Sequence, residues 1–326
     1  MAGIRVLDAG GVGAEVRGQR LWFDSQGESG ELTLVSHAHS DHAPRARAHA
    51  LATPETASIL KALGRRFRGR TLSFGERVKV GEALVSAEPS GHVLGSSQFL
   101  LEADGERLVY TGDLNVYDST LLRGAQPLET EKLIIEATYG LPDYVFPRRE
   151  ELYTQIIKWI LETIREGEIP AFKVYALGKA QEIIGLVNAY LKLPVVAGWT
   201  VSRVSEKHLE HGVRLSYLPL HSEEGLEAFT QGECVYVASR RENPPSRRRL
   251  RWAVATGWAL RYGYPRFDAA FPLSGHSDYP GLIDYVERSG PREVYVVHGY
   301  SEAFARRLRK MGWRARSLGE AQDFLL

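Results

Sequence analysis

The sequence has little cysteine, no long apolar run and almost no net charge. A single cysteine, Cys234, among 326 residues excludes an intramolecular disulfide. It begins the apolar stretch Cys234–Ala238, which predicts a buried thiol on a strand. No apolar run is long enough to form a transmembrane helix, and residues 1–5 show no signal-peptide pattern. We therefore expect a cytoplasmic protein that has no membrane partner.

The near absence of net charge excludes a protein that is basic over its whole surface. The 41 lysine and arginine residues and the 40 aspartate and glutamate residues give a formal charge of +1. Basic residues nevertheless gather at 65–70, 240–252 and 306–310. Such clusters can bind phosphates at one face, although a solvated surface is favoured for the first and third. In the middle cluster both interpretations stay open. The candidate nucleic-acid contacts there are Arg247, Arg248 and Arg249.

The composition, 44% hydrophobic and 25% charged, is that of a globular protein with a large core. Residues 1–144 contain short apolar segments separated by glycine-rich turns, which predicts mostly strands. From about Pro147 helical and strand patterns alternate, and this predicts a small parallel sheet with helices. We interpret 145–255 as an α/β module inserted into a domain formed by 1–144 and 256–326. The predicted fold class is α/β.

The most distinctive stretch is Val35–His42, which holds three histidines and an aspartate within six positions. His37 and His39 follow a strand pattern, and alternate side chains of an extended chain point the same way, so both can bind one ion. Asp41 and His42 come after a turn and can reach a second ion. Imidazole and carboxylate groups suit zinc. A histidine-rich polar loop without a metal is the alternative, and it rarely produces this spacing.

Further groups of the same kind stand where predicted strands end or next to glycines, which is where a rigid scaffold presents reactive side chains. These residues are His92, Asp113, Glu136, His276 and His298. The other histidines lack this context, and we interpret them as structural or surface residues. They are His49, His208, His211 and His221.

Two supporting roles are predicted with alternatives. Asp24 or Asp8 can orient a ligand imidazole. Asp24 ends a strand shortly before the histidine motif and is preferred, and an ordinary turn carboxylate is the alternative for both. Lys179 lies at the start of a predicted helix, where backbone N–H groups favour anions. It is either a contact to a nucleic-acid phosphate or a solvated lysine.

The pattern His37-x-His39-x-Asp41-His42 resembles the signature of the metallo-β-lactamase superfamily of two-metal hydrolases. The order of Glu136, the Gly-His-Ser sequence at His276 and the strand-end His298 resembles its β-CASP branch, nucleases that carry an inserted α/β cap. This resemblance implies an αββα sandwich with a β-CASP cap at 145–255. It also implies two Zn²⁺ ions, or Mn²⁺ in their place. The implied ligands of one ion are His37, His39, His92 and Asp113. Those of the other are Asp41, His42, Asp113 and His298.

The resemblance further implies hydrolysis of a phosphodiester. Two zinc ions about 3.5–4 Å apart can share a hydroxide and clamp the phosphate for in-line attack, and Asp113 stands where it can bridge them. The leaving oxygen needs a proton, for which His276 is the implied general acid, oriented by Glu136. The alternatives are a further metal ligand for His276 and a loop-capping carboxylate for Glu136.

Four stretches resemble the ligase-associated DNA exonucleases, which are also described as mRNA 3′-end processing factors: 175–182, 255–258, 273–282 and 298–301. This implies a zinc-dependent nuclease acting on single-stranded DNA or RNA, with a DNA exonuclease of the repair type preferred and a ribonuclease that processes RNA 3′ ends as the alternative. A DNA ligase or a helicase is the implied protein partner. A metallohydrolase of small thioesters or lactones, and a non-catalytic binding subunit, are the alternatives of other classes.

Overall fold

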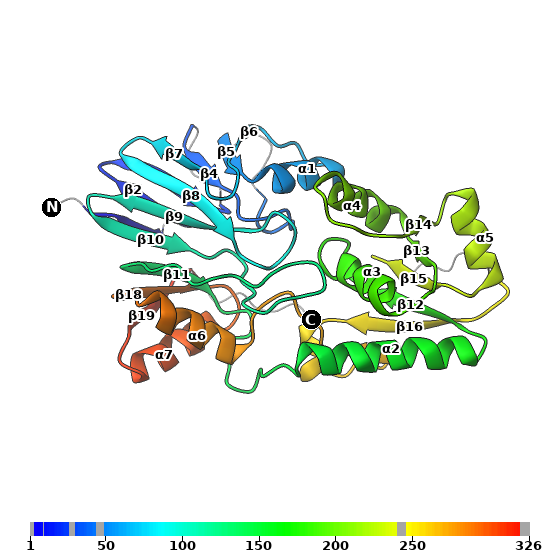
Figure 1. Ribbon diagram of the computed structural model, residues 1–326. Coiled ribbons are helices and arrows are strands. Elements are labelled where there is room, and N and C mark those ends of the chain that lie inside the picture. Colours follow the sequence, from blue (N-terminus) through cyan, green and yellow to red (C-terminus); the bar gives the residue numbers. More distant parts are fainter. Residues whose placement is uncertain (1–2, 9, 26–29, 44–48, 240–245, 320–326) are drawn as a thin grey trace. The chain divides into compact units, whose positions relative to one another are not determined.

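The computed structural model describes residues 3–8, 10–25, 30–43, 49–239 and 246–319 (Figure 1). The chain forms two compact units. The first unit comprises the described residues up to Asp118, Arg123–Val145, and the described residues from His276 onward. The second unit comprises Ser119–Leu122 and the described residues between Phe146 and Gly275. Within these ranges no helix is both long enough and apolar enough to cross a membrane.

Two sheets form the first unit. One has six strands, in the order β1-β2-β3-β4-β5-β6. Their bounds are Arg5–Asp8, Val12–Val16, Gln19–Phe23, Leu32–Leu34, His49–Ala52 and Gly69–Thr71. The other has seven strands, in the order β19-β18-β11-β10-β9-β8-β7. Its strands, from β7 to β11, are Arg77–Val80, Ala83–Pro89, Ser97–Ala103, Glu106–Tyr110 and Lys132–Glu136, with β18 at Glu293–Val297 and β19 at Arg314–Ser317.

The first unit has one core between the two sheets and another between the seven-stranded sheet and two helices. Leu21 and Leu34 of the six-stranded sheet pack with Phe99 of the seven-stranded sheet, because alternate side chains of a strand share a face. Helices α6 (Tyr279–Ser289) and α7 (Ser301–Lys310) cover the other face of the seven-stranded sheet (Figure 1). Helix α1 (Pro54–Ala62) follows β5. The predicted α/β fold class is confirmed.

The seven-stranded sheet brings distant parts of the sequence to one edge. Strands β9 and β10 form a hairpin, and its turn residues Asp104 and Gly105 have φ of 52° and 77°, as two-residue hairpin turns of type I′ require. Strands β10, β11 and β18 are parallel neighbours, so their carboxyl ends lie side by side. The residues that follow or end these strands include Asp113, Glu136 and His298.

The second unit contains a six-stranded sheet in the order β14-β13-β15-β12-β16-β17, and every pair in it is parallel. The prediction of a parallel sheet is confirmed. Strands β12 to β17 are Ile169–Lys173, Val195–Ala197, Leu218–Pro219, Val235–Ala238, Leu250–Ala255 and Ala269–Phe271. The helices are α2 (Arg149–Arg165), α3 (Lys179–Tyr190), α4 (Trp199–Glu210), α5 (Glu223–Gln231) and the 3-10 helix η1 (Gly257–Leu260). Cys234 precedes β15 and is buried, as predicted, and burial raises the pKa of its thiol to about 12.

The second unit extends beyond the predicted module boundary at residue 255. The structure places the end of this unit at Gly275. The physical reason is strand pairing, because Ala253 of β16 lies opposite Ala269 of β17 and Ala255 lies opposite Phe271. Residues between 256 and 275 therefore complete the parallel sheet.

Candidate metal centre

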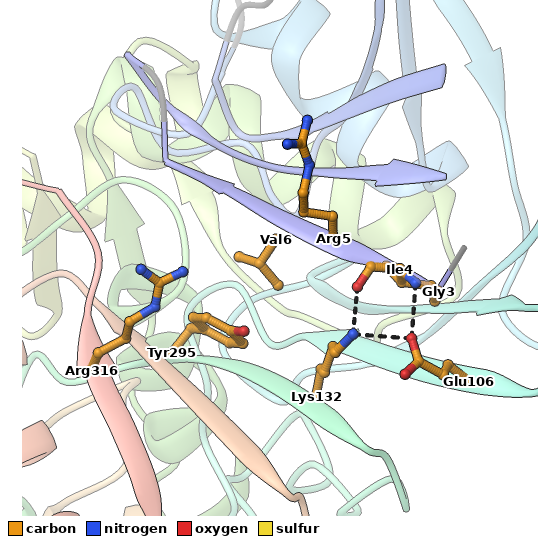
Figure 2. Close-up of a pocket in the computed structure, with 8 residues that line it drawn as sticks. All are labelled: Gly3, Ile4, Arg5, Val6, Glu106, Lys132, Tyr295 and Arg316. Atoms are coloured by element: carbon orange, nitrogen blue, oxygen red, sulfur yellow. Dashed lines mark hydrogen bonds and ion pairs between the residues drawn. The ribbon is translucent and has the colours of Figure 1, made fainter. Parts of the chain in front are cut away.

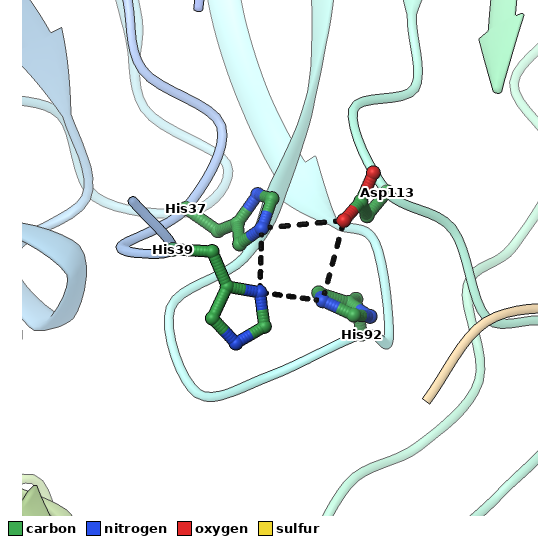
Figure 3. Close-up of side chains that lie close together, drawn as sticks. All are labelled: His37, His39, His92 and Asp113. Carbon is green, nitrogen blue, oxygen red and sulfur yellow. Dashed lines mark hydrogen bonds and ion pairs between the residues drawn. The ribbon is translucent and has the colours of Figure 1, made fainter. Parts of the chain in front are cut away.

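Three histidines and one aspartate of the first unit converge on a point. Figure 3 shows the side chains of His37, His39, His92 and Asp113 turned toward one another. His39 Nδ1 lies 3.0 Å from His37 Nε2 and 3.2 Å from His92 Nε2. Asp113 Oδ2 lies 3.3 Å from His37 Nε2 and 3.5 Å from His92 Nε2. The four donor atoms thus lie within 4.8 Å of one another.

These distances fit a tetrahedral zinc ion. With zinc–ligand bonds of about 2.0–2.1 Å, neighbouring ligand atoms of a tetrahedral site are about 3.3–3.4 Å apart. The distances of 3.0, 3.2, 3.3 and 3.5 Å lie on either side of that value. Three imidazoles and a carboxylate are also a donor set that zinc accepts. The residues present therefore fit the ion that the motif predicts.

A loop, rather than a strand, carries the first two of these histidines. Strand β4 ends at Leu34, and His37 and His39 lie in the irregular segment that follows. The expectation that an extended strand end aligns them is therefore wrong, although their ring nitrogens meet. Backbone bonds hold the loop, because Ser97 N–H donates to the Ser36 carbonyl at 2.9 Å and His42 N–H donates to the His39 carbonyl at 3.3 Å.

His92 is positioned by the tight loop after β8. The hydroxyl of Ser96 accepts hydrogen bonds from the N–H groups of His92 at 3.1 Å and Val93 at 3.0 Å. Gly91 has φ of 73°, and a Cβ there would lie 2.2 Å from the Asn115 carbonyl oxygen. The backbone thus requires glycine at position 91, which needs both a left-handed conformation and a close approach.

A second group of ligand-type atoms lies on the other side of Asp113. His42 Nε2 is 3.4 Å from Asp113 Oδ1 and 3.7 Å from Asp41 Oδ2. The ring of His298 lies 5.1 Å from the ring of His42, centroid to centroid. Asp113 therefore presents Oδ2 to the first cluster, at His37, and Oδ1 to the second, at His42. This is the arrangement in which one carboxylate can serve two ions.

Asp24 holds the second cluster in place, whereas Asp8 lies elsewhere. Asp24 Oδ2 accepts hydrogen bonds from His42 Nδ1 at 2.7 Å, from the Ser36 hydroxyl at 2.5 Å and from the Tyr110 hydroxyl at 2.8 Å. The bond to Nδ1 fixes the ring so that Nε2 faces Asp113. Asp8 instead accepts from the N–H of a glycine at 3.1 Å. The partners Ser36 and Tyr110 were not predicted, although Ser36 is the residue just before His37.

Opposite charges shift the pKa values of His42 and Asp113. Burial lowers the pKa of His42, but the carboxylates of Asp113 and Asp24 outweigh it and raise the pKa to about 10. Burial raises the pKa of Asp113, and the positive charges of His42 and His276 hold that pKa well below its ordinary value. In the metal-free protein His42 is thus a cation next to the Asp113 anion.

His276 and Glu136 form a pair beside Asp113. His276 Nδ1 lies 2.8 Å from Glu136 Oε1, and His276 Nε2 lies 3.9 Å from Asp113 Oδ2. Glu136 is fully buried and accepts N–H bonds from Leu114 at 2.8 Å and Thr138 at 2.9 Å. These bonds hold both carboxylate oxygens of Glu136 in place. Glu136 is therefore well placed to accept a hydrogen bond from the Nδ1–H of His276 and to stabilise a positive charge on that ring.

The predicted nucleic-acid contacts belong to the second unit and not to the cluster in the first. Arg249 forms ion pairs with Glu168 at 3.2 Å and Asp268 at 3.0 Å. The start of the predicted basic run, residues 240–245, lies outside the described residues. The contacts predicted in this unit are Lys179, Arg247, Arg248 and Arg249.

A polar pocket in the first unit contains none of the histidine-cluster residues (Figure 2). Its side chains are largely engaged with one another, because Lys132 Nζ donates to the Ile4 carbonyl at 2.6 Å and to Glu106 at 3.0 Å. Arg316 lies over the ring of Tyr295, with its guanidinium carbon 4.9 Å from the ring centroid. We therefore do not assign the chemistry to this pocket.

Known proteins resemble this chain at the level of family and fold. A family described as "Zn-dependent metallo-hydrolase RNA specificity domain" matches residues 269–318. A protein named "Probable DNA ligase" from Opitutus terrae is 34% identical over 313 residues, which are 92% of this chain and 30% of that protein. An "RNase J-like protein" from Methanocaldococcus jannaschii is 44% identical over 105 residues, 32% of this chain and 25% of that protein. The chain thus spans less than a third of the length of either relative.

A solved structure shares the fold. The crystal structure of a protein of unknown function from Enterococcus faecalis superposes with a TM-score of 0.63 at 16% identity, covering 89% of this chain and 91% of that one. Together the fold and the histidine–aspartate cluster define a metallo-hydrolase. The chain belongs to the β-CASP branch of the metallo-β-lactamase superfamily, a family of zinc-dependent hydrolases that includes nucleases.

Proposed function

We propose that the chain is a zinc-dependent nuclease that hydrolyses phosphodiester bonds in single-stranded nucleic acid, and that it is a DNA exonuclease of the repair type. The observation that carries this proposal is the pairing of His276 with buried Glu136 next to the carboxylate of Asp113. A proton donor beside a zinc-binding cluster is what cleavage of a P–O bond requires, because the leaving oxygen must be protonated.

The same residues that converge in the structure would hold the metal. One Zn²⁺ ion would be bound by His37, His39, His92 and Asp113, and the other by Asp41, His42, Asp113 and His298. When bound, the ions supply Lewis acidity and lower the pKa of water toward about 7. Mn²⁺ is the alternative metal.

The protein's own side chains would supply the proton. Glu136 accepts the Nδ1–H of His276, which turns Nε2 toward the side of Asp113. A proton on Nε2 can pass to the leaving oxygen, and Glu136 stabilises the imidazolium before the transfer. After the transfer the ring keeps its Nδ1 proton and becomes neutral. Glu136 is thus a positioning residue for His276.

Preference for DNA is supported by the relative named "Probable DNA ligase", which matches 92% of this chain within 30% of its own length. A DNA ligase is accordingly the protein partner that we propose, with a helicase as the other candidate.

The second candidate function is a ribonuclease that processes or degrades RNA. It is supported by the family description "RNA specificity domain" at residues 269–318 and by the 44% identity to the "RNase J-like protein".

The test is cleavage of matched end-labelled single-stranded DNA and RNA by zinc-loaded protein. We expect DNA products that shorten from one end, and we expect this activity to be lost in His276→Ala and Asp113→Ala. His49→Ala changes an exposed histidine on β5 and should cleave like the wild type. Cleavage of RNA alone would support the ribonuclease. Cleavage of neither, together with hydrolysis of a thioester or lactone, would replace the nuclease by a small-molecule hydrolase.

A further inference from the structure

We infer that Tyr175 and Trp199 form a stacking platform for unpaired bases at the carboxyl edge of the parallel sheet in the second unit. This inference rests on the proposed function and names residues that would hold its single-stranded substrate by the bases. We call these two aromatic residues the base-stacking platform.

Strand register places both rings at the same edge. Lys173, at the end of β12, lies opposite Ala238 of β15, and Ala197, at the end of β13, lies opposite Val237 of β15. Tyr175 and Trp199 each come two residues after their strand, so both extend beyond the same end of the sheet. Strand β15 lies between β12 and β13, which separates the two chain ends by about 10 Å. In open parallel sheets ligands bind outside this carboxyl edge.

Both rings are largely in contact with water. Tyr175 is 66% exposed and Trp199 is 57% exposed, although large aromatic rings normally contribute to a protein by being buried. A neighbour supports each ring, because Lys179 Nζ lies 5.1 Å from the centroid of Tyr175 and the ring of His221 lies 4.8 Å from that of Trp199. Each ring thus has a neighbouring group beside it, while much of each residue stays exposed.

Cations accompany the rings at this edge. Lys173 ends β12 with an exposed side chain, and Lys179 begins α3 over Tyr175. Arg203 is exposed and stands four residues after Trp199 in α4, hence on the same face of that helix. Aromatic faces combined with basic groups bind single-stranded nucleic acid, because bases stack on the rings while phosphates meet the cations. Stacking tolerates any base, so the platform predicts binding without sequence preference.

An exposed aromatic residue by itself needs no functional explanation. Tyr190 provides the comparison within the same unit, since it is 63% exposed but ends α3, at the opposite edge of the sheet. Tyr190 differs from the platform residues because Tyr175 and Trp199 stand at the same edge, each with a neighbouring group beside its ring. Tyr190→Ala is therefore the matched control for the platform.

The experiment measures binding of a fluorescent single-stranded DNA oligonucleotide to the zinc-loaded full chain carrying His276→Ala, which should slow turnover by about 10²–10⁴-fold. Adding Tyr175→Ala or Trp199→Ala should each weaken binding on the order of 5- to 100-fold, whereas adding Tyr190→Ala should leave it unchanged. An oligonucleotide of equal length and charge with abasic sites should bind more weakly than the intact one. That difference should disappear when both platform residues are replaced.

Equal binding of intact and abasic oligonucleotides by the unmodified platform would overturn the inference, because phosphate contacts alone would then explain the affinity. So would an equal loss in Tyr190→Ala. Thermal unfolding and zinc content of each variant show whether it is folded. The assay needs no hydrolysis, so failure of the proposed nuclease activity would appear as absent cleavage with the platform result intact.

Discussion

At the scale of single residues, the arrangement of Glu136 decides what His276 can do. Two backbone N–H groups and the His276 ring donate to this buried carboxylate. This carboxylate cannot turn away without breaking the bonds from Leu114 and Thr138. We therefore propose that Glu136 acts in the reaction by fixing the tautomer and direction of His276.

Replacing Glu136 by Gln tests this positioning role. We expect kcat to fall by about 10-fold or more, while His276→Ala should lower it by about 10²–10⁴-fold, the usual contribution of a general acid. Zinc content and KM should change little. Asp104→Asn, which alters an aspartate in the turn of the β9–β10 hairpin, serves as the control. A Glu136→Gln enzyme with wild-type kcat would contradict the role.

Asp24 supports the metal centre through His42. We expect Asp24→Asn to weaken zinc binding by about 10–100-fold, since the amide cannot accept the His42 Nδ1–H and the Ser36 hydroxyl in the same way. Competition with a chromogenic chelator measures this affinity. Asp8→Asn is the matched control and should bind zinc like the wild type, so an equal loss in both variants would refute the assignment.

The sequence was sufficient to find the ligand-type residues but not all of their supports. The spacing from His37 to His42 is local, and His92, His276 and His298 are marked by glycines or strand ends. Tyr110 carries no such mark, because its hydroxyl reaches Asp24 from a strand 86 positions away in the sequence. Contacts of this kind depend on how two sheets pack, which local pattern does not encode.

At the scale of elements, parallel pairing of β10, β11 and β18 gathers the site. Each strand can be predicted from an apolar run in the sequence. The order of the strands in the sheet cannot be predicted in this way. The same limit explains why the predicted module ends at residue 255, whereas the second unit ends at Gly275 in the structure. Strand β17 has three residues, Ala269–Phe271, and so short a run does not indicate which sheet it joins. Only its register with β16 assigns it to the second unit.

We predict that low pH destabilises the second unit because helix α4 contains a buried histidine, His208. Burial lowers the pKa of His208 to about 4, and the ring bonds to the Val204 carbonyl at 2.9 Å. The unfolded chain, with a pKa near 6.5, takes up a proton as pH falls while the folded chain does not. Stability is therefore unaffected above about pH 6.5 and declines toward pH 4, by roughly 3 kcal/mol at most.

Urea unfolding at pH 7 and pH 4.5 tests this pH dependence. His208→Gln removes the titrating group, so it should lose less stability between the two pH values than the wild type. His221→Gln changes a histidine with an exposed side chain and should behave like the wild type. Equal losses in all three proteins would show that His208 does not cause the acid sensitivity.

At the scale of the whole molecule, we expect zinc binding to release a proton from the protein. Since His42 has a pKa of about 10 in the metal-free protein, it is protonated at neutral pH and must release that proton to become a ligand. Apparent zinc affinity should therefore rise by about tenfold or more for each pH unit between pH 6.5 and 8.5. Chelator competition at several pH values measures it, and an affinity independent of pH would contradict the coupling.

The central claim, a two-zinc nuclease, is tested most directly by titrating zinc into metal-free protein while cleavage of an end-labelled single-stranded oligonucleotide is followed. We predict that activity rises until two zinc ions are bound per chain. We also predict that Asp113→Ala, which removes the carboxylate between the two clusters, stays inactive at any zinc concentration. Full cleavage by the metal-free protein, or by Asp113→Ala, would contradict the account.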